Sequence, residues 1–182
     1  MEIHRALKGK LNLRNIIAIC DVCCNTPEDS LKSELYSYVY HQDNRIGYNA
    51  LWVFTHFSPA DIEWLAPKRN ELVDMALTTS HVGRKRLILA LLERLPFGRD
   101  DVRSDYLDFC LSKINSTEPY GIRALCLRQA FAQCRFYPEL MDELKNEIEL
   151  MEQGTLSPGL EAARRIIRHK ITALRECLNL TL

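Results

Sequence analysis

Three cysteines near the N-terminus have a spacing that occurs in metal sites. Cys20, Cys23 and Cys24 offer thiols at Cys-x-x-Cys spacing, and thiolates are common ligands of structural zinc. Such a site needs four ligands, and neither a second Cys-x-x-Cys pair nor a His pair follows in the chain. We therefore interpret the three thiols as core packing groups, and we expect neither a bound metal nor a cofactor.

Two histidines, His56 and His81, are candidates for general-base chemistry. An imidazole catalyses only beside a positioned nucleophile or orienting group, and the sequence places none next to either residue. His81 is instead expected at the start of a helix that Ser80 caps. For Trp52 and Trp64, core packing with nearby aromatic residues is expected, and an aromatic binding pocket is the alternative.

Residues 67–70 read Pro-Lys-Arg-Asn and resemble part of the signature loop of the adenylosuccinate lyase and fumarase superfamily. In those enzymes a serine-rich stretch with the catalytic serine precedes the loop. Here residues 62–66 read Ile-Glu-Trp-Leu-Ala instead. We interpret the tetrapeptide as a spurious match, and we expect a binding module with no catalytic residues.

The helices that would position these residues follow a repeat. Glycines at 9, 47, 83, 121 and 159 are separated by 38, 36, 38 and 38 residues. The fourth residue after each glycine is apolar, and apolar residues continue at helical spacing, which predicts a helix A in every unit. We expect the glycine to let helix A approach the preceding unit closely.

A second helix, helix B, is predicted after each of the first four. The segments 27–41, 59–78, 100–115 and 138–153 begin with proline or acidic residues, as first turns of helices do. Pro67 lies inside the second segment and predicts a kink or a split near Ala66. Strand signals are missing, since no stretch alternates over six residues and hairpin dipeptides are absent.

Helix pairs that repeat every 36 to 38 residues are typical of an α-solenoid. The period, the two-helix unit and the proline at the start of helix B resemble HEAT and armadillo-like repeats over roughly residues 8–180. The resemblance implies an all-α superhelix of about four helix pairs plus a closing C-terminal helix, as a single domain over residues 1–182. The expected repeats are 9–46, 47–82, 83–120 and 121–158, with a half repeat at 159–180.

Charge is divided unevenly between the two kinds of helix, although the chain has 24 basic and 24 acidic residues. The helix B segments hold 17 acidic and six basic residues, so their net charge is near −11 and that of the remaining chain is near +11. A neutral chain has no general attraction to nucleic acid or to an anionic membrane. The resemblance implies that helix B lines a concave face, which is then acidic.

The acidic helix B face is the candidate binding surface. It would select a protein partner, and a basic one in particular, by electrostatic complementarity. In the competing interpretation the carboxylates only favour helix N-termini and pair with neighbouring helices. The candidate partner-binding residues are Asp101, Asp105, Asp108, Asp142, Glu143 and Glu149.

A basic surface on the helix A segments carries the alternative function. HEAT-like folds include DNA alkylation-repair glycosylases that hold duplex DNA in a basic groove, so the resemblance implies nucleic acid as a second candidate ligand. This chain departs from them in its shorter length, its neutral charge and the helix layer that carries its basic residues. The candidate residues are Arg84, Lys85, Arg86, Arg123, Arg164, Arg165 and Arg168, accompanied by Arg128 and Lys170.

The fifth unit has only helix A, and two interpretations of its outer side stay open. In the first, basic residues make that side a solvated cap, as in many terminal repeats. In the second, apolar residues form a homodimer surface. The basic set is Arg164, Arg165, Arg168 and Lys170, and the apolar set is Ile171, Leu174, Leu178 and Leu182.

Targeting signals are not evident. The apolar run at residues 16–20 is too short for a signal peptide or a membrane span. The cysteine number is odd, and Cys110, Cys126, Cys134 and Cys177 lie in amphipathic segments, which indicates reduced, buried thiols. We therefore expect a cytoplasmic protein with no membrane partner.

Overall fold

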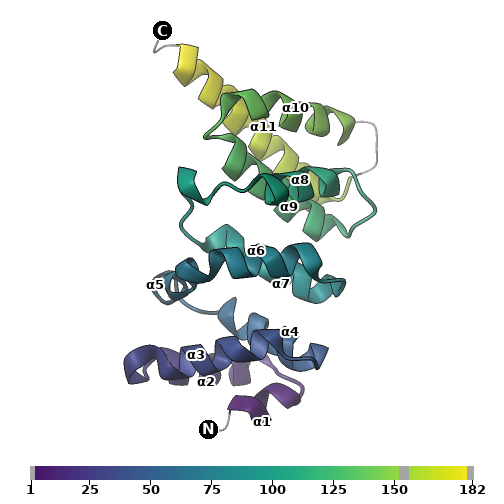
Figure 1. Cartoon of the computed structure of the whole chain (residues 1–182). Helices are drawn as coiled ribbons and strands as arrows, with labels where there is room; N and C mark the ends of the chain where they lie inside the picture. The colour runs from purple at the N-terminus through teal and green to yellow at the C-terminus, as the bar shows by residue number, and fades with distance from the viewer. Residues whose placement is uncertain (1–2, 152–155, 180–182) are drawn as a thin grey trace. The chain divides into compact units, whose positions relative to one another are not determined.

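The chain folds into helices only. The computed structural model describes residues 3–151 and 156–179, and neither range contains a strand. The helices group into two compact units, Met1–Pro96 (unit 1) and Phe97–Leu182 (unit 2) (Figure 1). The helical content confirms the all-α fold class that the sequence period predicts.

Unit 1 contains seven of the described helices, joined by short 3-10 turns at 27–29, 38–40 and 63–68. Their bounds are α1 Ile3–Lys8, α2 Leu13–Cys24, α3 Ser30–Ser37, α4 Asn44–Phe54, α5 Pro59–Ile62, α6 Arg69–Thr78 and α7 Val82–Arg94. α2 packs on α3 and α4, α4 packs on α7, and α6 packs on α7. Leu35, Phe54, Leu72 and Ile88 are fully buried where these helices meet.

Pro67 splits the second helix B, as the sequence predicts. It lies in the 3-10 segment Glu63–Lys68, between α5 and α6. Proline lacks the N–H that a continuous α-helix needs, and its ring clashes with the preceding turn. Ser58 starts α5, since its hydroxyl accepts a hydrogen bond from the backbone N–H of Asp61 at 3.1 Å.

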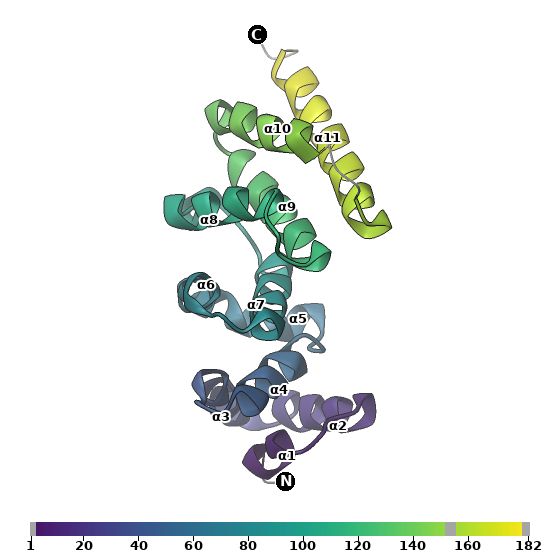
Figure 2. The same cartoon turned by 90° about the vertical axis from the view of Figure 1, so that its right-hand side faces the viewer.

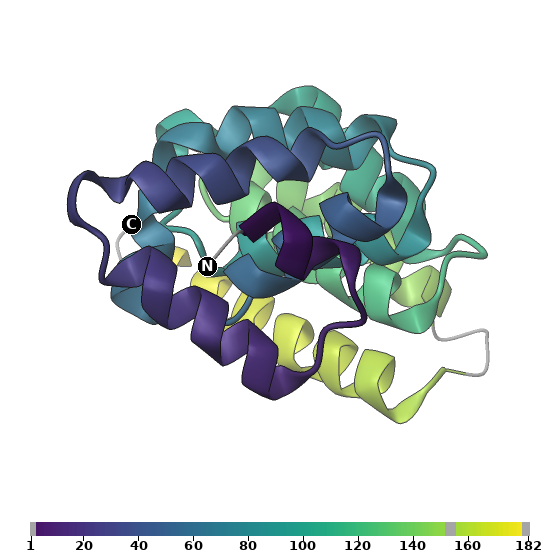
Figure 3. The same cartoon turned by 90° about the horizontal axis from the view of Figure 1, so that it is seen from below.

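α1 is an element that the repeat period does not predict. Its residues Ile3 and Leu7 lie one helical turn apart, and both are buried where α1 packs on α4. The side-chain amide of Asn49 in α4 donates to the carbonyls of Leu7 and Gly9, at 2.8 and 3.2 Å. Asn49 thereby satisfies acceptors at the end of α1. Figure 3 looks onto this end of unit 1.

Unit 2 has two helix layers. Its helices are α8 Ser104–Ile114, α9 Tyr120–Cys134, α10 Met141–Leu150 and α11 Pro158–Asn179. α9 packs on α8, α10 and α11, and α10 also packs on α8 and α11. In Figure 2, α8 and α10 form one side of the unit and α9 and α11 the other. The two sides correspond to the segments predicted as helix B and helix A.

Close approach explains two of the repeat glycines. A Cβ on Gly83 would lie 3.0 Å from Cε2 of Tyr48 in α4, and a Cβ on Gly47 would lie 3.1 Å from an arginine carbon of α7. A Cβ on Gly9 would meet its nearest neighbour at 3.7 Å, which is ordinary contact, and one on Gly159 would meet nothing within 4 Å. Close packing therefore favours glycine at Gly47 and Gly83, whereas Gly9 and Gly159 have room for a Cβ.

His81, and not Ser80, caps α7. The Nδ1 atom of His81 accepts a hydrogen bond from the backbone N–H of Arg84 at 3.1 Å. The backbone N–H of His81 in turn donates to the hydroxyl of Thr79 at 3.2 Å. The prediction for Ser80 is wrong because α7 begins at Val82, which places His81 in the N-cap position.

Candidate partner-binding surfaces

Asp101 shapes a turn, although the sequence analysis places it on a helix face. It lies in the 3-10 turn Arg99–Asp101, ahead of α8. Its carboxylate accepts a hydrogen bond from the backbone N–H of Gly98 at 2.7 Å. The carboxylate therefore closes the turn that precedes α8.

Two other predicted acidic residues form ion pairs inside unit 2. Arg103 donates from Nε and Nη2 to the two carboxylate oxygens of Asp105, at 3.1 and 2.7 Å. This hydrogen bonding lowers the pKa of Asp105 below its usual value. Asp142 of α10 accepts a hydrogen bond from Arg175 of α11 and lies 3.9 Å from Nζ of Lys145. Both carboxylates already have cationic neighbours.

The last three predicted acidic residues have no such partner. Asp108 of α8 and Glu143 and Glu149 of α10 are exposed, and none forms an ion pair with a residue of the described ranges. α8 contacts α10, and Asn115 after α8 donates from Nδ2 to the carbonyl of Glu147 at 2.8 Å. We call Asp108, Glu143 and Glu149, on these neighbouring helices, the α8–α10 acidic face.

The three predicted basic residues in α7 differ in exposure, since Arg86 is exposed, Arg84 is half-buried and Lys85 is buried. The Arg84 guanidinium donates to the carbonyl of Val39 at 2.6 Å and to the side chain of Asn44 at 3.2 Å. Burial lowers the pKa of Arg84. Lys85 is only 8% exposed, whereas Arg86 is exposed. The structure therefore does not bring these three residues together as a basic surface.

Arg123 of α9 also contacts the main chain. Its Nε donates to the carbonyl of Ile114, the last residue of α8, at 2.7 Å. Its guanidinium carbon lies 5.5 Å from the centroid of the Tyr120 ring. A cation at this position compensates the partial negative charge of the C-terminus of α8.

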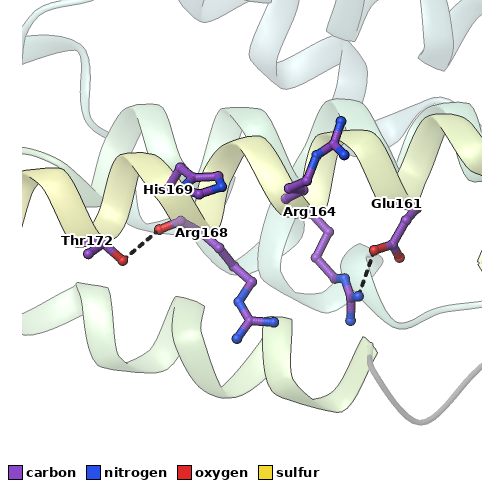
Figure 4. A pocket seen from close by; sticks show the side chains of 6 residues that line it. Glu161, Arg164, Arg168, His169 and Thr172 are labelled. Atoms are coloured by element: carbon purple, nitrogen blue, oxygen red, sulfur yellow. Dashed lines mark hydrogen bonds and ion pairs between the residues drawn. The ribbon is translucent and has the colours of Figure 1, made fainter.

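The remaining basic candidates line an open groove on α11. The groove has a volume of about 360 Å³, and its lining residues are Glu161, Arg164, Arg165, Arg168, His169 and Thr172 (Figure 4). These positions recur every three or four residues, so they share one helix face. Arg164 donates to Glu161 at 2.7 Å, and Arg165 and Arg168 are exposed. We call the three arginines and His169 the α11 basic groove.

Of the four apolar residues considered for self-association, the structure describes the side chains of Ile171 and Leu174. Ile171 is 3% exposed and belongs to the core of unit 2, and Leu174 is half-buried. The side chain of Leu178 and the whole of Leu182 lie outside the described residues. Burial therefore removes Ile171 from a surface that a second copy could contact.

The candidate histidines and tryptophans have structural partners. Nδ1 of His56 lies 3.0 Å from the carbonyl of Trp52 and 3.2 Å from the hydroxyl of Thr55. The Trp52 ring lies next to that of His56, at 6.2 Å between centroids. Trp64 stacks on the buried Phe54 at 6.2 Å and 6°. The two tryptophans thus belong to different clusters. His56 lies within hydrogen-bond distance of a carbonyl in the last turn of α4.

A further cluster on unit 1 joins Trp64 to residues that the sequence does not connect with it. The ammonium of Lys68 lies 4.7 Å from the ring centroid of Tyr36, 5.5 Å from that of Trp64 and 3.9 Å from Oε1 of Glu71. The hydroxyls of Tyr36 and Tyr40 donate to Oε2 of Glu71 at 3.2 and 2.8 Å. We call Tyr36, Tyr40, Trp64 and Glu71 the aromatic–acidic cluster. Its sequence signals are Trp64, for which an aromatic pocket is the alternative, and a pair of tyrosines four positions apart.

The cysteines occupy packed positions. Burial raises the pKa of Cys20 to about 12 and those of Cys23 and Cys24 to about 11. Cys110, Cys126 and Cys134 are buried, as predicted, and the side chain of Cys177 lies outside the described residues. Within the described residues, no group of three or more His, Cys, Asp or Glu side chains is arranged to hold a metal ion.

Comparison with known proteins agrees with the paired helices. A family model for a HEAT repeat domain matches residues 3–171. No curated protein and no solved structure matches the chain. In the part of the chain that the structure describes, no helix combines the length and apolar character needed to cross a bilayer. Since the family model covers nearly the whole chain and the resemblance to HEAT-like repeats is confirmed, this chain belongs to the HEAT repeat domain family.

Proposed function

We propose that this chain is a non-catalytic scaffold that binds a protein partner through the α8–α10 acidic face. Membership of the HEAT repeat family makes the chain a helical-repeat scaffold. The observation that carries the proposal is the exposure of Asp108, Glu143 and Glu149 without a cationic partner in the described residues. Such carboxylates are free to meet cations of another molecule.

Electrostatics favours a basic partner. Exposed charges of one sign attract a partner of opposite sign and speed its association, mainly at low salt. Asp105 and Asp142 contribute less to this attraction, because Arg103 and Arg175 already offset their charges. We therefore expect the three carboxylates of the acidic face to dominate recognition, with the paired ones at its edge.

The test combines capture with charge reversal. The tagged protein is incubated with lysate of its host after nuclease treatment, and retained proteins are identified for the wild type and for the triple variant D108K/E143K/E149K. We expect the triple variant to lose at least about 90% of a specific partner, since each reversed charge adds repulsion. Asp101 is left unchanged because its reversal would disturb the turn that it holds.

A matched control separates position from net charge. The variant D21K/E28K/E63K changes the net charge equally at exposed residues of unit 1, on helices other than α8 and α10. We expect it to retain the partner. If both triple variants lose the partner equally, or if neither does, the acidic face is not the binding surface.

The α11 basic groove supports nucleic acid as a second candidate ligand. Three arginines and a histidine share one groove there, and Arg165 and Arg168 are exposed. Cations spaced along one helix face can follow a phosphate backbone and release its counterions. Arg168 of this groove and Glu149 of the acidic face line one neighbouring cavity, so the two surfaces adjoin there. The same protein samples test both ligands.

Fluorescence anisotropy with labelled duplex and single-stranded DNA tests this alternative. Binding through the groove is expected to weaken by about tenfold or more between 50 and 200 mM salt, as counterion release requires. The R165E/R168E variant should abolish it, whereas R86E, on an exposed residue of α7, should not. Binding without salt dependence, or equal loss in both variants, would rule the groove out.

A further inference from the structure

We propose that the aromatic–acidic cluster of unit 1 binds a basic side chain of a protein partner, and that Lys68 occupies this site in the unbound protein. The idea that the partner is a basic protein rests on the proposed function. The site itself does not, because Tyr36, Tyr40, Trp64 and Glu71 lie on other helices than the α8–α10 acidic face.

The position of Lys68 shows what chemistry the cluster accepts. Its ammonium lies 4.7 and 5.5 Å from the ring centroids of Tyr36 and Trp64, within the range of cation–π attraction. It also lies 3.9 Å from Oε1 of Glu71. Two aromatic faces and a carboxylate around one cation form a receptor for an ammonium or a guanidinium group.

The groups of the receptor are held in place before any partner arrives. The hydroxyls of Tyr36 and Tyr40 both donate to Oε2 of Glu71, which leaves Oε1 directed to the cation. The Tyr36 ring meets the Trp64 ring edge-on at 6.0 Å, and Trp64 stacks on buried Phe54. Side chains fixed in this way lose little conformational entropy on binding.

The cluster is open to solvent on its outer side only, because Tyr36, over whose ring Lys68 lies, is just 6% exposed. Tyr40 is 51% exposed, and the side chains of Lys68 and Glu71 are 30% and 50% exposed. An incoming arginine or lysine that displaces Lys68 replaces its two cation–π contacts and its ion pair with contacts of the same kind. The aromatic rings supply the kind of surface on which binding hot spots form.

The local backbone explains why Lys68 reaches the site. Lys68 ends the 3-10 segment that Pro67 imposes, and Arg69 follows it at the start of α6. Arg69 is 5% exposed and donates to the carbonyl of Pro96, so it anchors the segment. In the tetrapeptide that resembles a lyase loop, Pro67 thus interrupts the helix, Lys68 supplies the cation at the cluster, and Arg69 bonds the carbonyl of Pro96.

The chain contains two tryptophans, which give a direct readout. The ¹⁵N-labelled protein is titrated with an acetylated, amidated Gly-Arg-Gly-Arg-Gly peptide, and the two indole N–H resonances are followed. We expect Trp64 to shift in a saturable way and Trp52, in its separate cluster, to stay in place. A peptide with citrulline in place of arginine, which keeps the shape but lacks the charge, should leave both unchanged.

Three variants test the roles of single groups. Lys68→Met removes the internal competitor and should strengthen peptide binding by about twofold to fivefold. Glu71→Gln should weaken binding by about threefold to tenfold, because the cation loses its carboxylate. Glu63→Gln changes an exposed carboxylate of the same 3-10 segment and should have no effect. An unshifted Trp52 resonance verifies that each variant is folded.

The outcomes are distinct from those of the capture experiment. Equal responses to the arginine and citrulline peptides, or no change of affinity in the Lys68 and Glu71 variants, would overturn the cluster as a cation site and leave the α8–α10 acidic face untouched. Peptide binding at Trp64 without capture of a basic protein would support the site and contradict the proposed function.

Discussion

Arg135 donates from Nη2 to the main-chain carbonyl of Phe97, 38 residues earlier in the chain, at 3.0 Å. Arg94 donates in the same way to the carbonyl of Phe57, 37 residues earlier, at 2.5 Å, and to that of Thr55 at 2.7 Å. Both arginines stand at the end of a helix A, and both phenylalanines lie three residues after the preceding helix A. The same kind of hydrogen bond thus forms in two places, each time between residues that are about one repeat period apart.

Replacing Arg94 by lysine tests this contact. A lysine ammonium lacks the planar fork that lets one guanidinium reach two carbonyls, so Arg94→Lys should lower the free energy of unfolding by about 1 kcal/mol. Urea unfolding of the variant measures the loss. Arg86→Lys is the control, because Arg86 is exposed, and its effect should stay within about 0.5 kcal/mol. Equal losses would contradict a special role for Arg94.

The cap of α7 gives a second prediction. His81→Ala removes the side-chain acceptor for the backbone N–H of Arg84 and should destabilise the protein by about 1 kcal/mol. His81→Asn should retain most of the stability, since asparagine is a good N-cap. Thermal unfolding measures both. Ser80→Ala should have little effect, and a loss as large as that of His81→Ala would show that the cap is assigned to the wrong residue.

The glycines provide a matched pair of substitutions. Gly83→Ala places a Cβ 3.0 Å from the Tyr48 ring and should cost about 1–3 kcal/mol of stability through overpacking. Gly159→Ala meets nothing within 4 Å in α11 and should be neutral or stabilising by up to about 1 kcal/mol, because alanine favours helix. Chemical unfolding compares the two. A tolerated alanine at 83 would show that α4 and α7 are not closely packed there.

The reactivity of the Cys24 thiol should rise with pH over a more alkaline range than that of an ordinary cysteine. Burial, followed by the nearby Asp61 carboxylate, raises its pKa to about 11. Since the thiolate is the reactive form, alkylation of Cys24 by iodoacetamide should keep accelerating up to about pH 11. Asp61→Asn should move this profile to lower pH, and Glu63→Gln should not. Mass spectrometry of the labelled protein measures the rate.

The same raised pKa predicts a loss of stability in alkaline solution. The ordinary thiol pKa is 9.0, so between pH 9 and pH 11 the unfolded chain has released the Cys24 proton while the folded chain still holds it. The stability contribution is therefore complete below pH 9 and declines as pH rises toward 11. Unfolding midpoints that stay constant over this range would contradict the raised pKa.

The helices could be predicted from the sequence because their signals are local. The apolar residue four positions after each glycine and the proline within 59–78 influence only the one or two helical turns around them. The structure has α2, α4, α7, α9 and α11 in the expected segments. α1 was missed because it precedes the first glycine of the series. Its evidence, Ile3 and Leu7, amounts to one helical turn.

The roles of charged residues could not be predicted in the same way. Arg84 and Lys85 have the sequence signature of a basic surface. In the structure, Arg84 is half-buried and bonds the carbonyl of Val39, 45 residues earlier, and Lys85 is buried. The aromatic–acidic cluster joins Glu71 to Tyr36 and Tyr40 across 35 and 31 residues. Whether a polar side chain is free or engaged depends on such distant partners, which periodicity does not encode.

Arginines that bind carbonyls alter what a net charge of zero means for this chain. Arg84, Arg94, Arg123 and Arg135 direct hydrogen bonds to main-chain oxygens, and none forms an ion pair with a residue that the structure describes. Their charges are offset by helix ends and turns, and not by carboxylates. The three residues of the α8–α10 acidic face likewise form no ion pair with a described residue. Dissolved cations can accumulate at these exposed carboxylates, although the chain has equal numbers of acidic and basic residues.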